Sequence, residues 1–239
     1  MEFLDEIINL LNEGKTRDVI DKITLFLDEN PKYKTIDYFH FANPIEEILY
    51  GVYIGDAESI NQLGLDEPLE EIYQIYSIAY MIEGKVDDAE KYLKIANQIN
   101  PVSAIILMRI CEFYQNKNEE EKLKDLALDL MKYTYDVELL ISSYFKLADY
   151  YYHTNQELEL YDHLFNFFIA LKGEDKDVSE DIKFLESKGV QVGFNPEVVQ
   201  ILLYLYDTHS KQGFKATAEF FKNILDEIVE FSRFIKSLR

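Results

Sequence analysis

The sequence is poor in the residues that interrupt helices or cross-link loops. Its 239 residues include nine glycines, five prolines, one cysteine and no tryptophan. A lone cysteine cannot form an internal disulfide, which excludes a disulfide scaffold and fits a reducing compartment. Scarce helix breakers, combined with 48% hydrophobic residues, argue against disorder and favour an all-α chain.

Basic residues are also in short supply. The chain has 24 lysines and arginines against 45 acidic residues, for a formal net charge of −21. Nucleic-acid binding depends on basic side chains that neutralise phosphates, and anionic membrane surfaces attract the same residues. We therefore expect neither nucleic acid nor a membrane among the partners. The acidic balance permits basic partners, and it also serves simple solubility.

Long hydrophobic runs are missing as well. No uncharged apolar run approaches the length of about 18 residues that a membrane-spanning helix needs. The first residues, MEFLDEIINLL, are acidic where a secretory signal peptide needs positive charge. With the single cysteine, these features lead us to expect a cytoplasmic protein.

The most informative stretch runs from Tyr73 to Pro101, where two amphipathic segments meet at Gly84. Glycine accepts left-handed backbone angles and so ends the first helix. Pro101 ends the second helix, because proline disfavours helical angles in the residue before it. Large residues alternate with small ones such as Ala89, and a small side chain lets paired helices approach closely. The stretch therefore predicts a helical hairpin.

The spacing within this hairpin resembles the tetratricopeptide repeat family, whose repeat has about 34 residues and a closing proline. Tyr73 stands where that family usually has tryptophan, and Ser77 stands where it has glycine or alanine. The resemblance implies a right-handed α-solenoid of antiparallel helix pairs. The matching positions are Tyr73, Tyr76, Ser77, Tyr80, Gly84, Ala89, Leu93, Ala96 and Pro101.

About six helix pairs are expected, of which the second and the last are irregular. Residues 1–33 form the first pair, because Gly14 and Pro31 have the same separation as Gly84 and Pro101. Residues 35–68 are less regular. A helix begins at Asn43-Pro44, a short one runs from Asp56 through Leu63 to Gly64, and residues 37–41 fit a helical turn or an extended piece equally well. The later pairs are 102–114 with 119–133, 137–153 with 157–171, and 197–211 with 214–238.

We expect one domain over residues 1–239, with an irregular insertion at 172–196. This insertion contains a charged loop and a short helix at 178–188, and it is the one candidate for a subdomain joint. The last helix, 214–238, is long and repeats apolar residues every seven positions. Such a helix suits a terminal cap, or alternatively the seam of a homodimer.

The chain carries no sequence motif for nucleotide, metal or nucleophilic chemistry. Its four histidines, His40, His153, His163 and His209, share no i, i+3 or i+4 spacing, so we expect no metal and no cofactor. Each histidine is expected at the surface or in packing. Cys111 lies among apolar neighbours on a helix face and is expected to be buried and inert.

The family resemblance implies that a partner lies in a concave groove lined by the first helix of each pair. The lysine, arginine and asparagine with which some family members hold a carboxylate are missing at the matching places. Arg109 and Lys146 lie two residues before the small position of their pairs, which turns them about 200° out of the core. They would orient an acidic ligand, or alternatively pair with Glu112 or Asp149. The expected groove residues are Gln74, Met108, Arg109, Phe145, Lys146 and Tyr152.

The leading expectation for function is a non-enzymatic scaffold or adaptor that binds a peptide or partner protein in this groove. The alternative is an assembly or regulatory protein that self-associates through its last helix. An enzyme with an unrecognised site is the third reading.

Overall fold

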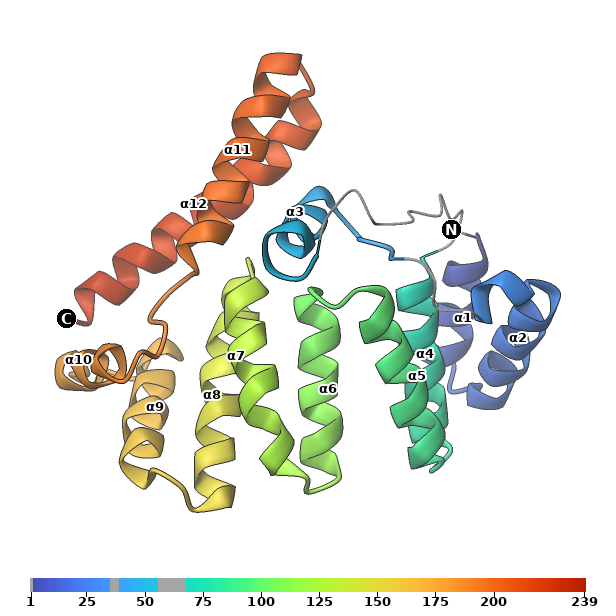
Figure 1. Cartoon of the computed structure of the whole chain (residues 1–239), viewed down its shortest axis with the longest axis horizontal. Helices are drawn as coiled ribbons and strands as arrows, with labels where there is room; N and C mark the ends of the chain where they lie inside the picture. The colour runs from blue at the N-terminus through green and yellow to red at the C-terminus, as the bar shows by residue number, and fades with distance from the viewer. Residues whose placement is uncertain (1, 35–38, 56–67) are drawn as a thin grey trace. The chain divides into compact units, whose positions relative to one another are not determined.

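The computed structural model describes residues 2–34, 39–55 and 68–239, and every regular element within these ranges is helical (Figure 1). The all-α expectation is confirmed. The chain divides into two compact units, residues 1–106 and residues 107–239, and each is described here by itself. The expectation of a single domain over 1–239 stays a prediction.

Unit 1 is built from two antiparallel helix pairs with a single helix between them in sequence. The helices α1 and α2 pack together, and both pack against α4, which pairs with α5. The elements are α1 (Glu2–Asn12), α2 (Thr16–Glu29), the 3-10 helix η1 (Pro31–Lys34), α3 (Pro44–Tyr53), α4 (Leu69–Ile82) and α5 (Val86–Ile99). Helix α6 (Ala104–Asn116) begins in this unit and ends in the next.

Unit 2 contains three helices packed in sequence, a short helix and a final helix pair. Helix α8 packs against both α7 and α9, α10 packs against α9, and α11 pairs with α12. The elements are the 3-10 helix η3 (Glu120–Lys122), α7 (Leu123–Tyr133), α8 (Val137–Thr154), α9 (Leu158–Leu171), α10 (Ser179–Ser187), α11 (Pro196–Gln212) and α12 (Lys215–Ser237). The segment expected as one helix at 119–133 is thus a 3-10 turn followed by α7.

Four of the hairpins turn in the same way. At Gly14, Gly84, Asn118 and Gly213 the backbone has φ values of 74°, 73°, 53° and 81°. The next N–H in each case donates to a carbonyl five residues back, as in Lys15 to Leu10 at 2.9 Å. This is the bonding of a Schellman motif, which satisfies the last helical carbonyls and needs a left-handed residue. The turns predicted from sequence at Gly14 and Gly84 are confirmed.

Helices α4 and α5 are in direct contact at small residues. Ala89 is fully buried, and the Ser77 hydroxyl donates to the Ala89 carbonyl at 2.7 Å. The aromatic stripe of α4 is buried at Tyr73 and Tyr76, as the sequence predicts. A bulkier side chain at the 89 position would push the two helices apart.

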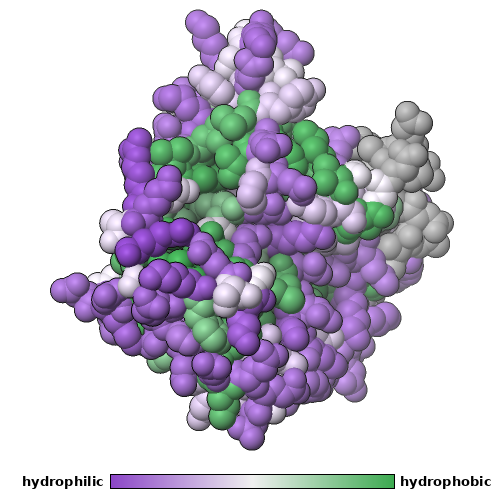
Figure 2. All heavy atoms as spheres, turned by 60° about the vertical axis from the view of Figure 1, so that its left-hand side comes forward, coloured by the Kyte–Doolittle hydropathy of each residue, from purple (hydrophilic) through white to green (hydrophobic). Residues whose placement is uncertain are grey.

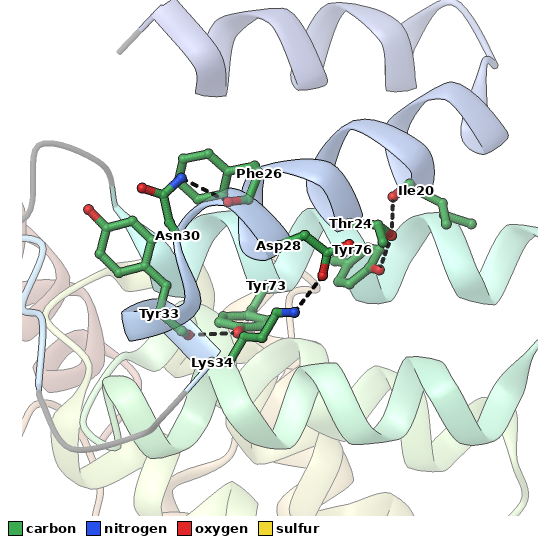
Figure 3. A network of polar contacts seen from close by, with 9 residues as sticks. All are labelled: Ile20, Thr24, Phe26, Asp28, Asn30, Tyr33, Lys34, Tyr73 and Tyr76. Carbon is green, nitrogen blue, oxygen red and sulfur yellow. Dashed lines mark hydrogen bonds and ion pairs between the residues drawn. The ribbon is translucent and has the colours of Figure 1, made fainter.

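Hydroxyl groups join the first helix pair to α4 (Figure 3). The Tyr73 hydroxyl donates to the carbonyl of Tyr33 at 2.9 Å, and the hydroxyls of Thr24 and Tyr76 lie 2.6 Å apart. Thr24 also donates to the Ile20 carbonyl within its own helix at 2.7 Å. These bonds satisfy polar atoms that the aromatic stripe would otherwise bury without partners.

The start of α3 agrees with the sequence. The Asn43 side chain accepts hydrogen bonds from the N–H groups of Ile45 and Glu46 at 3.0 and 3.2 Å, and Pro44 occupies the first turn. Residues 39–41 adopt no regular secondary structure. The short helix expected from Asp56 to Gly64 lies outside the described residues, as do positions 37 and 38.

Loop 189–195 is anchored to α7 and α8 by hydrogen bonds. Gln191 donates to the Met131 carbonyl at 3.0 Å, and Asn195 donates to the Lys132 carbonyl at 2.9 Å. The buried Tyr144 hydroxyl donates to the Gln191 carbonyl at 3.0 Å and accepts from the Gly193 N–H at 2.8 Å. Loop 189–195 thus supplies polar groups that satisfy carbonyls at the end of α7 and the Tyr144 hydroxyl in the middle of α8. The division between the two units lies inside α6, and the expectation of a joint within 172–196 stays a prediction.

Within the described ranges, no helix combines the length and the apolar character needed to cross a lipid bilayer.

The close contact between α4 and α5 gives a direct test. We expect Ala89→Leu to lower the free energy of unfolding by about 1–3 kcal/mol, because the added atoms have no space between the helices. Thermal or urea unfolding measures the change. The same substitution at the exposed Ala216 is the control and should change stability little. Equal stability of the wild type and Ala89→Leu would place Ala89 away from the tight contact.

The anchoring of loop 189–195 gives a second test. Tyr144→Phe keeps the buried ring but leaves the Gln191 carbonyl and the Gly193 N–H without their shared partner. We expect a loss of about 1–3 kcal/mol in unfolding free energy. Tyr204→Phe removes a hydroxyl from a ring that is 63% exposed and serves as the control. Identical urea midpoints for the two variants would contradict the anchoring role.

Candidate functional site

The expected groove residues fall into two sets. Gln74 belongs to unit 1, and the other five belong to unit 2. Gln74, Met108 and Lys146 are buried, which leaves them little surface for a partner. Arg109 is exposed. Phe145 and Tyr152 lie two turns apart on α8, and both present part of their rings to solvent.

The expectation that Lys146 points out of the core is wrong. Its side chain is only 8% exposed, and its ammonium donates to the Gln115 side chain of α6. Lys146 lies two residues before the small position that was expected to face α9, the second helix of its own pair, but Gln115 of α6 contacts that side of α8. The position of a neighbouring helix cannot be read from a single amphipathic stripe.

Phe145 and Tyr152 belong to a continuous set of five aromatic side chains along α8 and α9, named here the aromatic strip. Adjacent ring centroids are 5.1 Å apart for Phe145–Phe168, 6.4 Å for Phe168–Phe165, 5.7 Å for Phe165–Tyr161 and 5.1 Å for Tyr161–Tyr152. None of the five is buried, and Tyr152 is 56% exposed. The members are Phe145, Tyr152, Tyr161, Phe165 and Phe168.

Sequence reasoning missed the three members on α9, because it expected first helices alone to line the binding surface. The signal was present. Tyr161, Phe165 and Phe168 lie at i, i+4 and i+7, which places them on one face of α9. The preceding positions Leu160 and Leu164 form a separate stripe that is buried. Helix α9 therefore has two apolar stripes, and only one of them enters the core.

The ends of the strip are defined by helix caps and an ion pair. Helix α8 begins where the Asp136 side chain accepts from the Leu139 N–H at 2.9 Å, and it ends at Asn155 with φ 53°. Beyond Phe145 and Phe168, the exposed Glu138 and Lys172 side chains pair at 3.2 Å. An exposed pair of this kind contributes about 0–1 kcal/mol. It bounds the strip without covering it.

A chain of polar contacts borders the strip on the side of α6. The Gln115 amide accepts from the Lys146 ammonium and donates to the Asp149 carboxylate at 2.5 Å. His153 lies 3.3 Å from the other Asp149 oxygen, and its ring meets Tyr152 edge to face at 5.1 Å. The amide thus bridges a buried cation and a carboxylate, and holds both in place. The aromatic strip has one fixed polar edge.

Other reactive side chains are engaged in structural contacts. His163 bonds to Asp181 at 2.7 Å and stacks on Phe184, and His209 lies 2.8 Å from the Leu205 carbonyl. Within the described residues, no three histidine, cysteine or acidic side chains are grouped to hold a metal ion. Burial raises the pKa of the Cys111 thiol to about 12, in agreement with the expected inert cysteine.

Comparison with known proteins finds no family model, no curated protein and no solved structure that matches this chain.

The raised pKa of Cys111 predicts slow thiol chemistry. At pH 8 only about one thiol in 10⁴ is ionised, and the thiolate is the reactive form. We expect an aromatic disulfide reagent to modify the native chain at least about 100-fold more slowly than the chain unfolded in guanidinium. The double variant Cys111→Ala, Glu112→Cys moves the thiol to the adjacent exposed position and is the control. Equal rates for the native thiol and this control would contradict the assignment.

Proposed function

We propose that this chain is a non-enzymatic interaction module that binds a segment of a partner protein on the aromatic strip. The observation that carries the proposal is Tyr152, which is 56% exposed and in ring contact with an otherwise half-buried run of four aromatic side chains. Tyrosine is among the residues that dominate binding energy at protein interfaces. An aromatic surface of this kind is typical of a binding site rather than of a solvated face.

The rings support binding for a second reason. Each ring of the strip already touches a neighbour on its own or the facing helix, so its rotamer is restricted before a partner arrives. Fixing a free side chain at an interface costs about 0.5–1.5 kcal/mol, and a pre-packed ring avoids most of this cost. The strip is therefore better suited to binding than the same rings on separate exposed helices.

The dimensions of the strip favour a short helical partner segment. Phe145 and Tyr152 are seven residues apart on α8, which is about 10 Å at 1.5 Å per residue. A partner helix with apolar residues at i, i+4 and i+7 presents a stripe of the same length. The polar edge at Asp149 and His153 would then meet the polar side of that helix.

We further propose that the helix pairs stack as a right-handed solenoid similar to tetratricopeptide repeats. Three pieces of evidence support this arrangement: the residue spacing from Tyr73 to Pro101, the recurring Schellman turns, and the 34-residue step from the turn at Gly84 to the turn at Asn118. The C-caps also repeat, since the backbone N–H groups of Asn30 and Asn100 donate to equivalent carbonyls four residues back.

Self-association through the last hairpin is the second candidate, and a specific observation favours it. Phe220 is 49% exposed on α12, and Leu203 and Tyr204 are exposed on α11. Figure 2 shows hydrophobic surface below the tip of the α11–α12 hairpin, which stands at the top of that view. Sedimentation equilibrium distinguishes the candidates. A wild-type dimer that becomes a monomer in Phe220→Ser supports self-association through the α11–α12 hairpin, and a monomeric wild type contradicts it.

The aromatic strip is tested by selecting peptides from a displayed random library against the whole chain and measuring their affinities by fluorescence anisotropy. We expect Tyr152→Ser and Phe165→Ser each to weaken binding at least about tenfold, or 1.4 kcal/mol, because a central aromatic anchor is lost. Both positions lie outside the core, and each lost ring contact contributes only about 0.5–1.5 kcal/mol, so both variants should remain folded under the conditions of the binding assay.

Leu203→Ser and Tyr204→Ser on α11 are the matched controls, since they remove exposed apolar side chains at a distance along the chain from the strip. These controls should bind the selected peptides with wild-type affinity. Peptides that bind Tyr152→Ser and Phe165→Ser as tightly as the wild type would overturn the proposal.

A further inference from the structure

Unit 1 contains a buried polar cluster that the proposed function does not use. Glu46 of α3 and Glu70 of α4 are 4% and 2% exposed, and Asn100 at the end of α5 is fully buried. His40, in the segment before α3, completes the cluster with a side chain that is 25% exposed. Two carboxylates and one imidazole thus share a site from which water is largely excluded.

The cluster joins α3 and its preceding segment to α4 and α5. Asn100 donates to a Glu46 carboxylate oxygen at 2.8 Å, and the same oxygen accepts from the Ala42 N–H at 2.9 Å. The backbone N–H of His40 donates to the Ile99 carbonyl at 3.1 Å. The His40 ring nitrogen Nδ1 lies 2.7 Å from the Glu70 carboxylate. Three of these contacts therefore join α3 or its preceding segment to the α4–α5 hairpin, at Asn100, Ile99 and Glu70. The fourth contact, from Ala42 to Glu46, lies within the α3 segment itself.

Two acceptor atoms in the cluster lack a hydrogen bond. Within the described residues, Oδ1 of Asn100 and Oε2 of Glu70 are buried without a hydrogen-bond donor, and Oε2 of Glu70 lies 2.7 Å from the His40 Nδ1 as an ion-pair contact. A buried carboxylate with an unsatisfied oxygen is costly unless a positive charge lies beside it. The protonated His40 ring is the cation that meets this requirement. A neutral ring would leave the buried Glu70 carboxylate without a neighbouring cation, whereas Glu46 keeps its hydrogen bonds to Asn100 and Ala42.

We propose that this cluster is a pH-controlled latch, which holds α3 on the α4–α5 hairpin while His40 is protonated and loosens α3 when His40 becomes neutral. Loosening would expose Ile45 and Leu49, which are fully buried on α3. The latch lies in unit 1 and is independent of the aromatic strip in unit 2.

The direction of the pH dependence follows from the groups around His40. The hydrogen bond to Glu70 is the largest effect that raises the pKa of His40 above 6.5, and Glu46 and Glu71 add to it. Burial raises the pKa of Glu46, and the neighbouring Glu70 charge adds to that effect. The facing groups are thus Glu46 on α3 and Glu70 and Glu71 on α4, while α5 contributes the neutral Asn100.

The raised pKa values of His40 and Glu46 act on the docking of α3 in the same direction. A raised pKa means that the docked form binds the proton more tightly than the loosened form does. The stabilisation of docked α3 by His40 is fully present below pH 6.5, the ordinary pKa of histidine, and it is lost as the pH rises through the raised pKa of His40. The stabilisation by Glu46 begins to fall at a lower pH, because the ordinary pKa of glutamate is 4.5. Docking of α3 is therefore tightest under mildly acidic conditions.

Hydrogen–deuterium exchange of the full chain between pH 5.5 and 8.5, corrected for intrinsic exchange rates, tests the latch. We expect amide protection in α3 to fall about tenfold or more across this range, while protection in α8 stays constant. His40→Gln should show low α3 protection at every pH. His163→Gln removes the other buried histidine–carboxylate pair and should leave the α3 profile as in the wild type.

Glu70→Gln provides a second readout if His40→Gln is poorly folded. Without the Glu70 charge, the His40 ring should titrate at lower pH by NMR, and the loss of α3 protection should move with it. Protection of α3 that varies less than twofold with pH in the wild type would overturn the latch. A pH profile that persists unchanged in His40→Gln or Glu70→Gln would overturn it as well.

Discussion

The fold depends on the close approach of paired helices at small side chains. An amphipathic helix gains stability mainly by covering its apolar stripe, and the facing helix can reach that stripe only where bulk is absent. The contact between Ser77 and Ala89 meets this condition in the α4–α5 pair, where a hydroxyl–carbonyl bond also joins the two helices. The large rings of Tyr73 and Tyr76 are buried beside it because the helices are already close. The Schellman turn at Gly84 returns the chain at the short distance that this contact requires.

The same geometry explains why an aromatic strip remains at the surface of unit 2. Helices α8 and α10 cover only part of the circumference of α9, and Leu160 and Leu164 are buried there. The stripe containing Phe165 and Tyr161 faces another direction, and Tyr161 contacts the exposed ring of Tyr152 on α8. Aromatic side chains in this position gain about 0.5–1.5 kcal/mol from each ring contact, yet they retain apolar area that a partner could bury. The strip is thus partly stabilised and still incomplete.

Buried charge is the second constraint on this acidic chain. Lys146 is buried against Gln115, and Glu46 is buried against Asn100, so in each case an uncharged amide satisfies the charged group. An amide can donate and accept together, which allows it to connect a charge with a further partner. The contact of His40 with Glu70 differs because its strength depends on a proton. Removing one member of such a cluster costs more than the bond itself, since the remaining charge loses its compensation.

The sequence by itself determined the local structure. The turn at Gly84 and the cap at Asn43 depend on bonds between residues at most five positions apart, and such bonds follow from residue type and the 3.6-residue period. Only the tertiary structure decided which of the positions expected in solvent are covered by another helix. Lys146 was expected in solvent but lies against α6, and His40 meets a partner 30 positions away in Glu70. A helical stripe defines direction relative to one neighbour, while burial and ion pairing depend on every helix nearby. For that reason the helix pairs and the second apolar stripe of α9 could be predicted, and the contact of that stripe with Phe145 and Tyr152 of α8 could not.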